Sequence, residues 1–235
     1  MIFKRFGGTL WASMKPGTLY IVATPIGNLG DITLRALEVL KAVDLVLCED
    51  TRETRKVLEY FQLTKSVMSY HQHSSEVVEQ DIIEKLKEGK NIALVTDAGT
   101  PGISDPGNKL VSAVSRVGEH LSIVPIPGPS ALTAALSVSG FPTEKFLFLG
   151  FPPHKNKRKK FFEEVAATPY TVAFYESSHR IKKAIDEIQQ IVDENREICI
   201  CRELTKKFEQ IYRGKVRDLK TMVISEKGEF VVIIR

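Results

Sequence analysis

Short apolar strands that run directly into glycine- and proline-rich loops, each followed by a helix, recur along this chain of 235 residues. The clearest example begins with the apolar run Asn91–Thr96, continues through the loop Asp97–Gly107 and leads into the helical segment Asn108–Val117. Uninterrupted apolar runs of this kind are typical of strands buried on both faces of a parallel sheet. The succession of strand, loop and helix therefore predicts an α/β fold with a doubly wound parallel sheet.

The same succession continues in the second half of the chain, after an interruption at Gly140-Phe-Pro142. We predict an N-terminal extension over 1–15, an α/β domain over 16–139 and a second α/β domain over 140–235, with the active-site cleft between the two domains. Strands are expected at Thr18–Ala23, Asp44–Cys48, Asn91–Thr96, Leu121–Ile126, Lys145–Phe151, Thr171–Tyr175, Glu197–Cys201, Phe208–Arg213 and Phe230–Arg235. Helices are expected at Leu34–Lys41, Arg52–Tyr60, Ser75–Lys87, Asn108–Val117, Ala131–Ser139, His179–Asp193 and Val216–Met222, with one more that ends near Ala167.

The composition is that of an ordinary folded protein, and its formal charge of +4 permits a nucleic-acid partner without requiring one. The three cysteines, Cys48, Cys199 and Cys201, are odd in number and lie in apolar runs, which argues against a disulfide framework and for a reducing compartment. No apolar stretch is long enough to span a membrane, and the N-terminus lacks the apolar core of a signal peptide. We therefore expect a cytoplasmic protein without membrane attachment, for which Met14 offers an alternative start.

Four loops follow predicted strands, namely Thr24–Gly30, Asp97–Gly107, Pro127–Ala131 and Glu176–Arg180. In open parallel sheets, ligands bind at the carboxyl ends of the strands, where loops meet helix N-termini. The chain has neither a Rossmann G-x-G-x-x-G nor a Walker A sequence, which disfavours dinucleotides and nucleoside triphosphates. The pair His71-Gln-His73 has no cysteine or carboxylate motif beside it, so no metal site is predicted.

Six segments resemble the tetrapyrrole methylase family, and the match runs from about Gly17 to the C-terminus. Within that family they are most similar to members that methylate small-subunit ribosomal RNA. Long ungapped motifs of this kind do not arise by chance. The segments are VATPIGNLGD (Val22–Asp31), LVTDAGTPGISDPG (Leu94–Gly107), IPGPSALTAALSVSGFP (Ile126–Pro142), FYESSHRI (Phe174–Ile181), RELTKKFEQIYRG (Arg202–Gly214) and KGEFVVII (Lys227–Ile234).

The resemblance implies two αβα domains in tandem, with S-adenosylmethionine bound in the cleft between them, and a homodimer. It also implies methyl transfer to the ribose 2′-hydroxyl of cytidine 1402 in 16S rRNA, so the expected partner is the small ribosomal subunit and not DNA. Two alternatives stay open. One is a methyltransferase that acts on a small tetrapyrrole precursor, and the other is a non-catalytic RNA-binding assembly factor that kept the fold.

The resemblance also assigns cofactor contacts, residue by residue. Other members carry Gly-Asp-Pro where this chain has Gly99-Thr100-Pro101, so an aspartate is absent there and Asp97 is the candidate to compensate for it. Glu203 is a further position that encloses the adenosine. The implied cofactor-binding residues are Pro25, Ile26, Asp97, Gly99, Thr100, Ile103, Ser130, Ala131, Tyr175, Leu204 and Gly228.

A ribose hydroxyl is a poor nucleophile, so a positioned base would accelerate the transfer by about 10²–10⁴-fold. We favour the charged clusters Glu49–Arg52 and Glu176–Arg180 for work on the substrate, because both follow strands. In the alternative interpretation these clusters only begin helices. The candidate bases are Asp50, Asp105, Glu176, His179 and Glu203, and the predicted catalytic set is Asp50, Arg52, Glu176, His179, Arg180 and Glu203.

The segment from His154 to Lys160 is the most basic part of the chain, since five of its seven residues are lysine or arginine. Such a run is expected either to contact RNA phosphates or to be the solvated start of a helix. Members of the family often carry a helical extension after the last strand, whereas this sequence stops at Arg235.

Overall fold

The computed structural model describes residues 15–72, 74–118 and 121–235. The predicted extension 1–15, with the alternative start at Met14, therefore lies outside the described residues except for Lys15, and so does His73. None of the helices within the described ranges combines the length and the apolar character that crossing a bilayer requires.

A parallel sheet of five strands forms the first half of the molecule, as predicted. β4 lies at its centre, where Ile92 pairs with Leu19 of β1 on one side and with Leu45 of β2 on the other. The strands follow the spatial order β3-β2-β4-β1-β5, which crosses over at the centre like other doubly wound sheets. Their bounds are β1 Thr18–Val22, β2 Leu45–Cys48, β3 Ser66–Ser69, β4 Ile92–Leu94 and β5 Ser122–Ile126.

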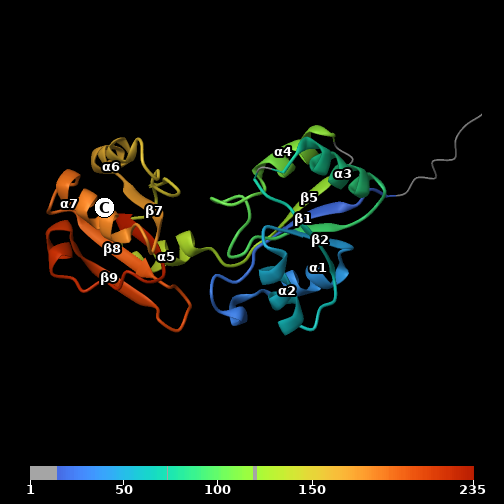
Figure 1. Cartoon of the computed structure of the whole chain (residues 1–235), viewed down its shortest axis with the longest axis horizontal. Coiled ribbons are helices and arrows are strands. Elements are labelled where there is room, and N and C mark those ends of the chain that lie inside the picture. The colour runs from blue at the N-terminus through green and yellow to red at the C-terminus, as the bar shows by residue number, and fades with distance from the viewer. Residues whose placement is uncertain (1–14, 73, 119–120) are drawn as a thin grey trace, which may run out of the picture.

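Helices cover both faces of this sheet (Figure 1). α1 (Leu34–Ala42) and α2 (Thr51–Tyr60) pack on one face, and α3 (Glu76–Lys87) and α4 (Asn108–Arg116) pack on the other. A short 3₁₀ helix, η1 (Leu29–Asp31), precedes α1. Because both faces are covered, the strands can be apolar throughout, which is the pattern that the sequence showed.

A second sheet of five strands, in the order β6-β7-β10-β8-β9, forms the other half of the molecule (Figure 1). Only β6 and β7 run parallel, and the other three pairs are antiparallel. Successive residues of its central strands face opposite layers, since Val232 packs with α6 and α7 while Val231 and Ile233 pack with α5. The strand bounds are β6 Phe146–Phe148, β7 Thr171–Ser177, β8 Glu197–Arg202, β9 Gln210–Lys215 and β10 Glu229–Ile234.

One layer over the second sheet consists of α6 (Arg158–Ala167), α7 (Ile181–Ile191) and the 3₁₀ helix η2 (Val216–Lys220). The opposite layer is α5 (Ala131–Ser139), which follows the last strand of the first sheet but packs on the second one. The structure is thus two αβα units in tandem, as expected. The predicted division between Ser139 and Gly140 stays a prediction, although the packing groups α5 with the second unit.

Besides the unpredicted 3₁₀ helix η1, two elements differ from the sequence predictions. β3 was not predicted, because its sequence Ser-Val-Met-Ser is short and half polar, and an edge strand needs no apolar run. The expected helix Val216–Met222 is the 3₁₀ helix η2, which ends at Lys220. Cys199 and Cys201 lie on the face of β8 that packs with α5, and both are buried free thiols, as expected for core residues.

Candidate active site

Three loops of the first unit are joined to one another at the carboxyl edge of its sheet. Thr24 and Gly99 form an antiparallel bridge, in which each amide donates to the other's carbonyl oxygen, at 2.9 and 3.1 Å. The hydroxyl of Thr24 donates to the carbonyl oxygen of Thr96 at 3.0 Å. The hydroxyl of Thr100 donates to the carbonyl oxygen of Pro129 at 3.1 Å. The loops after β1, β4 and β5 therefore form one connected surface.

The loop after β4 holds backbone conformations that L-amino acids rarely adopt. Gly99 has φ +86°, and a Cβ at this position would lie 3.3 Å from Cγ2 of Ile26. Ser104 has φ +64° although it carries a side chain. Such a conformation costs on the order of 1–3 kcal/mol, persists only where the surrounding structure enforces it, and is common at ligand sites.

A cavity of about 260 Å³ lies between this loop surface and the second sheet. Its wall is largely apolar, and Phe151 and Tyr175 stand in it with their ring centroids 5.4 Å apart. All four loops that the sequence singled out contribute to its lining. The predicted site residues that line it are Ile26, Gly99, Thr100, Ile103, Ser130, Ala131, Tyr175, Glu176, Glu203 and Leu204.

Sequence reasoning did not single out several residues that also line the cavity. Phe151 follows β6 and so occupies the same kind of position as the predicted loops, a signal that could have found it. Lys206 and Cys201 gave no such signal, because an isolated lysine and a buried cysteine in a strand are common in any fold.

Three of the predicted cofactor contacts lie outside the cavity lining. Pro25 stands between bridge residue Thr24 and lining residue Ile26. Asp97 accepts a hydrogen bond from the backbone amide of Asp50 at 3.1 Å, so it joins the loops after β2 and β4. Gly228 has φ +118° and supports Glu203, since a Cβ on Gly228 would lie 2.5 Å from Cγ of Glu203. Their contacts with a cofactor stay predictions.

Asp50 and Arg52 are at the start of α2, which is where the alternative interpretation placed them. The Asp50 side chain accepts the Arg52 amide as the N-cap of this helix, at 2.8 Å. It also binds the Arg52 guanidinium, with Nη2 and Oδ2 at 2.6 Å. This hydrogen bond lowers the pKa of the Asp50 carboxyl, which makes Asp50 a poor base. His179 lies in a separate surface hollow beside Lys182, Lys183 and Lys227.

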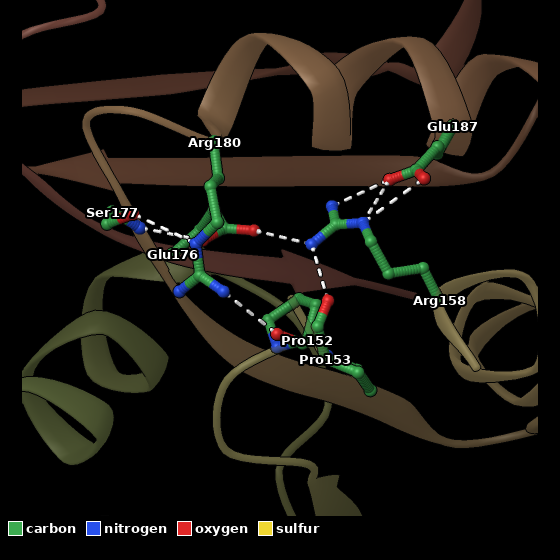
Figure 2. Close-up of polar contacts among 7 residues, drawn as sticks. All are labelled: Pro152, Pro153, Arg158, Glu176, Ser177, Arg180 and Glu187. Atoms are coloured by element: carbon green, nitrogen blue, oxygen red, sulfur yellow. Dashed lines mark hydrogen bonds and ion pairs between the residues drawn. The ribbon is translucent and has the colours of Figure 1, made fainter. Parts of the chain in front are cut away.

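Glu176 is buried and held between two arginines (Figure 2). Its Oε1 accepts from Nε of Arg180 at 2.9 Å and from the amide of Ser177 at 2.8 Å, and its Oε2 lies 3.6 Å from Nη1 of Arg158. Arg158 also binds Glu187, with Nη2 and Oε2 at 2.6 Å, and the two guanidinium groups donate to the carbonyl oxygens of neighbouring prolines. Glu176 thus anchors the end of β7 to α6 and α7.

This network corrects the interpretation of the basic run His154–Lys160. Arg158 is only 3% exposed and its guanidinium is occupied by Glu176, Glu187 and the carbonyl oxygen of Pro153, so it cannot contact RNA phosphates. The exposed side chain of Lys159 fits the alternative interpretation, in which the run is the solvated start of a helix. The run therefore combines one structural arginine with exposed lysines.

Glu203 also lines the cavity and has a left-handed conformation, with φ +52°. Its Oε1 accepts from the Glu229 amide and from Nζ of Lys206, both at 3.0 Å. Burial acts to raise the pKa of Glu203, but these two hydrogen bonds and the positive charges of Lys206 and Arg202 together outweigh it, and the pKa is lowered. Glu203 is therefore a stable anion in the cavity wall.

Asp105 has the opposite environment, although it lines the same cavity. Burial and the negative charges of Glu49 and Asp97 raise the pKa of Asp105 to about 6. The sequence marked it as a candidate base, but gave no reason to prefer it to the other acidic residues. That reason lies in the fold, because Glu49 follows β2 whereas Asp97 and Asp105 follow β4.

The N-terminus of α5 opens onto the cavity through Ser130 and Ala131. Ser130 makes no side-chain cap, so the first amides of this helix do not donate to its hydroxyl, although the Leu132 amide donates to Tyr175. Tyr175 reaches toward them from the second sheet. Burial raises the pKa of its hydroxyl, and hydrogen bonds from the Leu132 backbone and the Ser130 side chain oppose that effect. This end of the cavity can hold an anionic group.

Residues 18–220 match the family model of Tetrapyrrole (Corrin/Porphyrin) Methylases. The chain is 47% identical over 221 residues to a "Ribosomal RNA small subunit methyltransferase I" of Halalkalibacterium halodurans, covering 93% of this chain and 75% of that protein. It is 44% identical over 228 residues to the protein of the same name from Escherichia coli O157:H7, covering 95% and 79%.

Solved structures with little sequence similarity share the fold. They include the uroporphyrin-III-C-methyltransferase from Thermus thermophilus, with a TM-score of 0.62 at 19% identity, covering 92% of this chain and 94% of that one. The methyltransferase CobJ has a TM-score of 0.67 at 18% identity, with 93% of each chain covered. The sequence motifs, the paired αβα units and the family match lead to one conclusion: this chain belongs to the tetrapyrrole methylase family.

Proposed function

We propose that this protein transfers a methyl group from S-adenosylmethionine to the ribose 2′-hydroxyl of cytidine 1402 in 16S rRNA. The observation that carries the proposal is the similarity, at 42–47% identity over more than nine-tenths of the chain, to proteins whose names state methyl transfer to small-subunit ribosomal RNA. The cavity between the two units supports it, because its wall carries groups that suit each part of this methyl donor.

The residues of the cavity fit S-adenosylmethionine. Its carboxylate suits the uncapped N-terminus of α5 at Ser130 and Ala131. Its adenosine suits the apolar side chains of Ile26, Ile103 and Leu204. The cationic sulfonium suits a cavity whose acidic side chains outnumber its basic ones, since three glutamates and one aspartate line it with a single lysine.

When bound, S-adenosylmethionine supplies a methyl group that is already electrophilic, so the protein's main task is alignment. Holding the ribose oxygen, the methyl carbon and the sulfur in line supplies on the order of 7–11 kcal/mol of the barrier reduction. The joined loops at Thr24, Gly99 and Thr100 are suited to this, because their hydrogen bonds fix the cavity wall before a ligand arrives.

The test is methyl transfer from labelled S-adenosylmethionine to small ribosomal subunits isolated from cells that lack the modification. We expect label at cytidine 1402, located by mass spectrometry of nuclease fragments, and no label in subunits that already carry the methyl group. A folded protein that binds S-adenosylmethionine but leaves cytidine 1402 unlabelled would contradict the proposal.

Two other functions fit parts of the same observations. Solved structures of tetrapyrrole methyltransferases share the fold, so turnover of a uroporphyrinogen-type substrate is the outcome that would favour a small-molecule methyltransferase. Failure to bind S-adenosylmethionine in calorimetry would favour a non-catalytic RNA-binding factor.

The remaining expectations about the protein in the cell belong to the same proposal. We propose that it is a homodimer, as the family resemblance implies, and sedimentation velocity checks this. We also propose that it acts in the cytoplasm, where its ribosomal substrate is assembled, and cell fractionation checks this.

A further inference from the structure

Asp105 differs from the other acidic side chains that line the cavity, Glu176, Glu203 and Glu229, each of which has an ion pair. Asp50 binds Arg52, and Glu203 binds Lys206. Glu176 lies between two arginines. For Asp105, by contrast, its carboxylate makes no ion pair and accepts no hydrogen bond among residues 15–72, 74–118 and 121–235. Its carboxylate is therefore available to a ligand.

The loop that carries Asp105 places it between the two units of the molecule. Asp105 follows Ser104, whose strained backbone has φ +64° and whose Oγ would lie 3.3 Å from a Cβ built on Gly150 of the second unit. The negative charges of Glu49 and Asp97 of the first unit act on its carboxylate. Its own charge acts on the hydroxyl of Tyr175, which stands in the cavity wall.

We propose that Asp105 is the catalytic base that accepts the proton of the ribose 2′-hydroxyl during methyl transfer. This assignment rests on the proposed function and adds the group that was missing from it. The ribose oxygen forms a bond to the methyl carbon, the carbon–sulfur bond breaks with its electron pair going to sulfur, and the hydroxyl proton passes to a carboxylate oxygen of Asp105. The products are a 2′-O-methyl ribose, a neutral thioether and a protonated Asp105, which then releases its proton to solvent.

The surroundings of Asp105 make its carboxylate basic enough to accept this proton. The negative charges that act on it are those of Glu49 and Asp97. Tyr175 lines the same cavity, and so do the charged residues Glu176, Glu203, Lys206 and Glu229, which are already paired. Burial and the negative charges of Glu49 and Asp97 raise the pKa of Asp105 to about 6. At neutral pH it is then ionised, yet more basic than an ordinary aspartate. A bound sulfonium lowers this pKa again, because opposite charge favours the carboxylate.

The experiment compares three variants with the wild type in single-turnover methyl transfer between pH 5 and 8, using saturating labelled S-adenosylmethionine and unmodified small ribosomal subunits. Asp105→Asn keeps the shape and removes the base, and Asp105→Glu keeps the carboxylate. Asp81→Asn is the matched control, since Asp81 pairs with Lys85 on the exposed surface of α3. Calorimetry measures S-adenosylmethionine binding by each protein.

We expect the wild-type rate to rise with pH and to level off, with a midpoint at or below about 6. Asp105→Asn should bind S-adenosylmethionine but transfer methyl about 10²–10⁴-fold more slowly and without that rise. Asp105→Glu should keep the pH dependence at a reduced rate, and Asp81→Asn should match the wild type.

Three outcomes would overturn the assignment, and they are distinguishable. If Asp105→Asn transfers methyl at the wild-type rate, the base lies elsewhere while the proposed function stands. If both Asp105 variants lose S-adenosylmethionine binding, Asp105 holds the methyl donor and is not the base. If the wild type itself binds S-adenosylmethionine but does not methylate the subunits, the proposed function fails and the assignment fails with it.

Discussion

Acidic residues that look alike in the sequence have different chemistry because of the residues around them. Glu176 is fixed by Arg158 and Arg180, so its charge is neutralised and its position is structural. Asp105 is partly buried and has like charges beside it, so its pKa is raised and its proton is held more tightly. Within the same cavity the pKa of Glu203 is lowered while that of Asp105 is raised, and such a separation of two acids is common at catalytic sites. Which acid has which environment depends on residues that are distant in sequence.

The raised pKa of Asp105 has a measurable consequence for stability. A carboxyl whose pKa is about 6 in the folded state and about 3.9 in the unfolded chain destabilises the fold once it ionises. While Asp105 is protonated, below about pH 4, it does not destabilise the fold. The destabilisation grows as the pH rises through 6 and the folded protein must hold an ionised carboxylate. We therefore expect Asp105→Asn to be more stable than the wild type at pH 8, by at most about 3 kcal/mol, and by about half as much at pH 5. Urea unfolding at both pH values measures the difference, and a difference independent of pH would show that the pKa of Asp105 is not raised.

Gly228 has no side chain, which leaves room for Glu203 in the cavity wall. Substituting alanine strains the backbone at φ +118° and pushes the new methyl group against Cγ and Cδ of Glu203, at 2.5 and 2.9 Å. We expect Gly228→Ala to lose about 1–3 kcal/mol of stability and to bind S-adenosylmethionine more weakly, because Glu203 must move. Gly140→Ala is the control, since Gly140 has φ +80° but nothing within 4 Å of the added carbon. Calorimetry should show weaker binding only for Gly228→Ala, and equal affinities would place Glu203 outside the binding site.

In the second unit, side chains at the ends of helices and strands hold neighbouring elements in position. Arg158 in the first turn of α6 reaches Glu176 at the end of β7 and Glu187 on α7, so one side chain fixes three elements (Figure 2). The sequence could predict α6 from its apolar spacing, but it could not separate Arg158 from the neighbouring lysines. That distinction needs the position of β7, which is set by pairing with β10 at a distance of more than fifty residues along the chain.

Breaking this network should therefore destabilise the fold far more than removing a neighbouring charge. Arg158→Ala leaves Glu176 buried beside a single arginine, and removing one partner of a buried ion pair costs about 3–5 kcal/mol. Lys159→Ala is the control, because that side chain is 82% exposed and its contact with Glu163 is long, at 3.7 Å. Its loss should change the free energy of unfolding by less than about 1 kcal/mol. Urea unfolding measures both, and similar midpoints for the two variants would contradict the structural role of Arg158.

At the scale of the whole molecule, the sequence predicts the strand directions of the first unit better than those of the second, although it misses the edge strand β3. The apolar strands and capped helices of the first unit follow local rules, and Thr33 and Asp50 cap the expected helices. In the second unit, the direction of β10 between β7 and β8 depends on long-range pairing and not on any local pattern. The assignment of α5 to the second sheet has the same cause. Its small apolar residues suit either unit, and only the packing of Leu132, Ala135 and Leu136 shows which sheet they cover.

The cavity joins the two units, so a bound ligand should order both of its walls together. S-adenosylmethionine at a hundred times its Kd should stabilise the protein by about 2.7 kcal/mol through mass action. Hydrogen exchange should then slow in the loop 97–107 of the first unit and also in the segment around Glu203 and Leu204 of the second, because each contributes to the lining. The turn at Gln62, between α2 and β3, serves as the internal control, since it lies outside the cavity lining and should exchange at the same rate with and without ligand. Slower exchange in only one of the two walls would mean that the ligand binds one unit alone, and the cavity would then not be the site of the methyl donor.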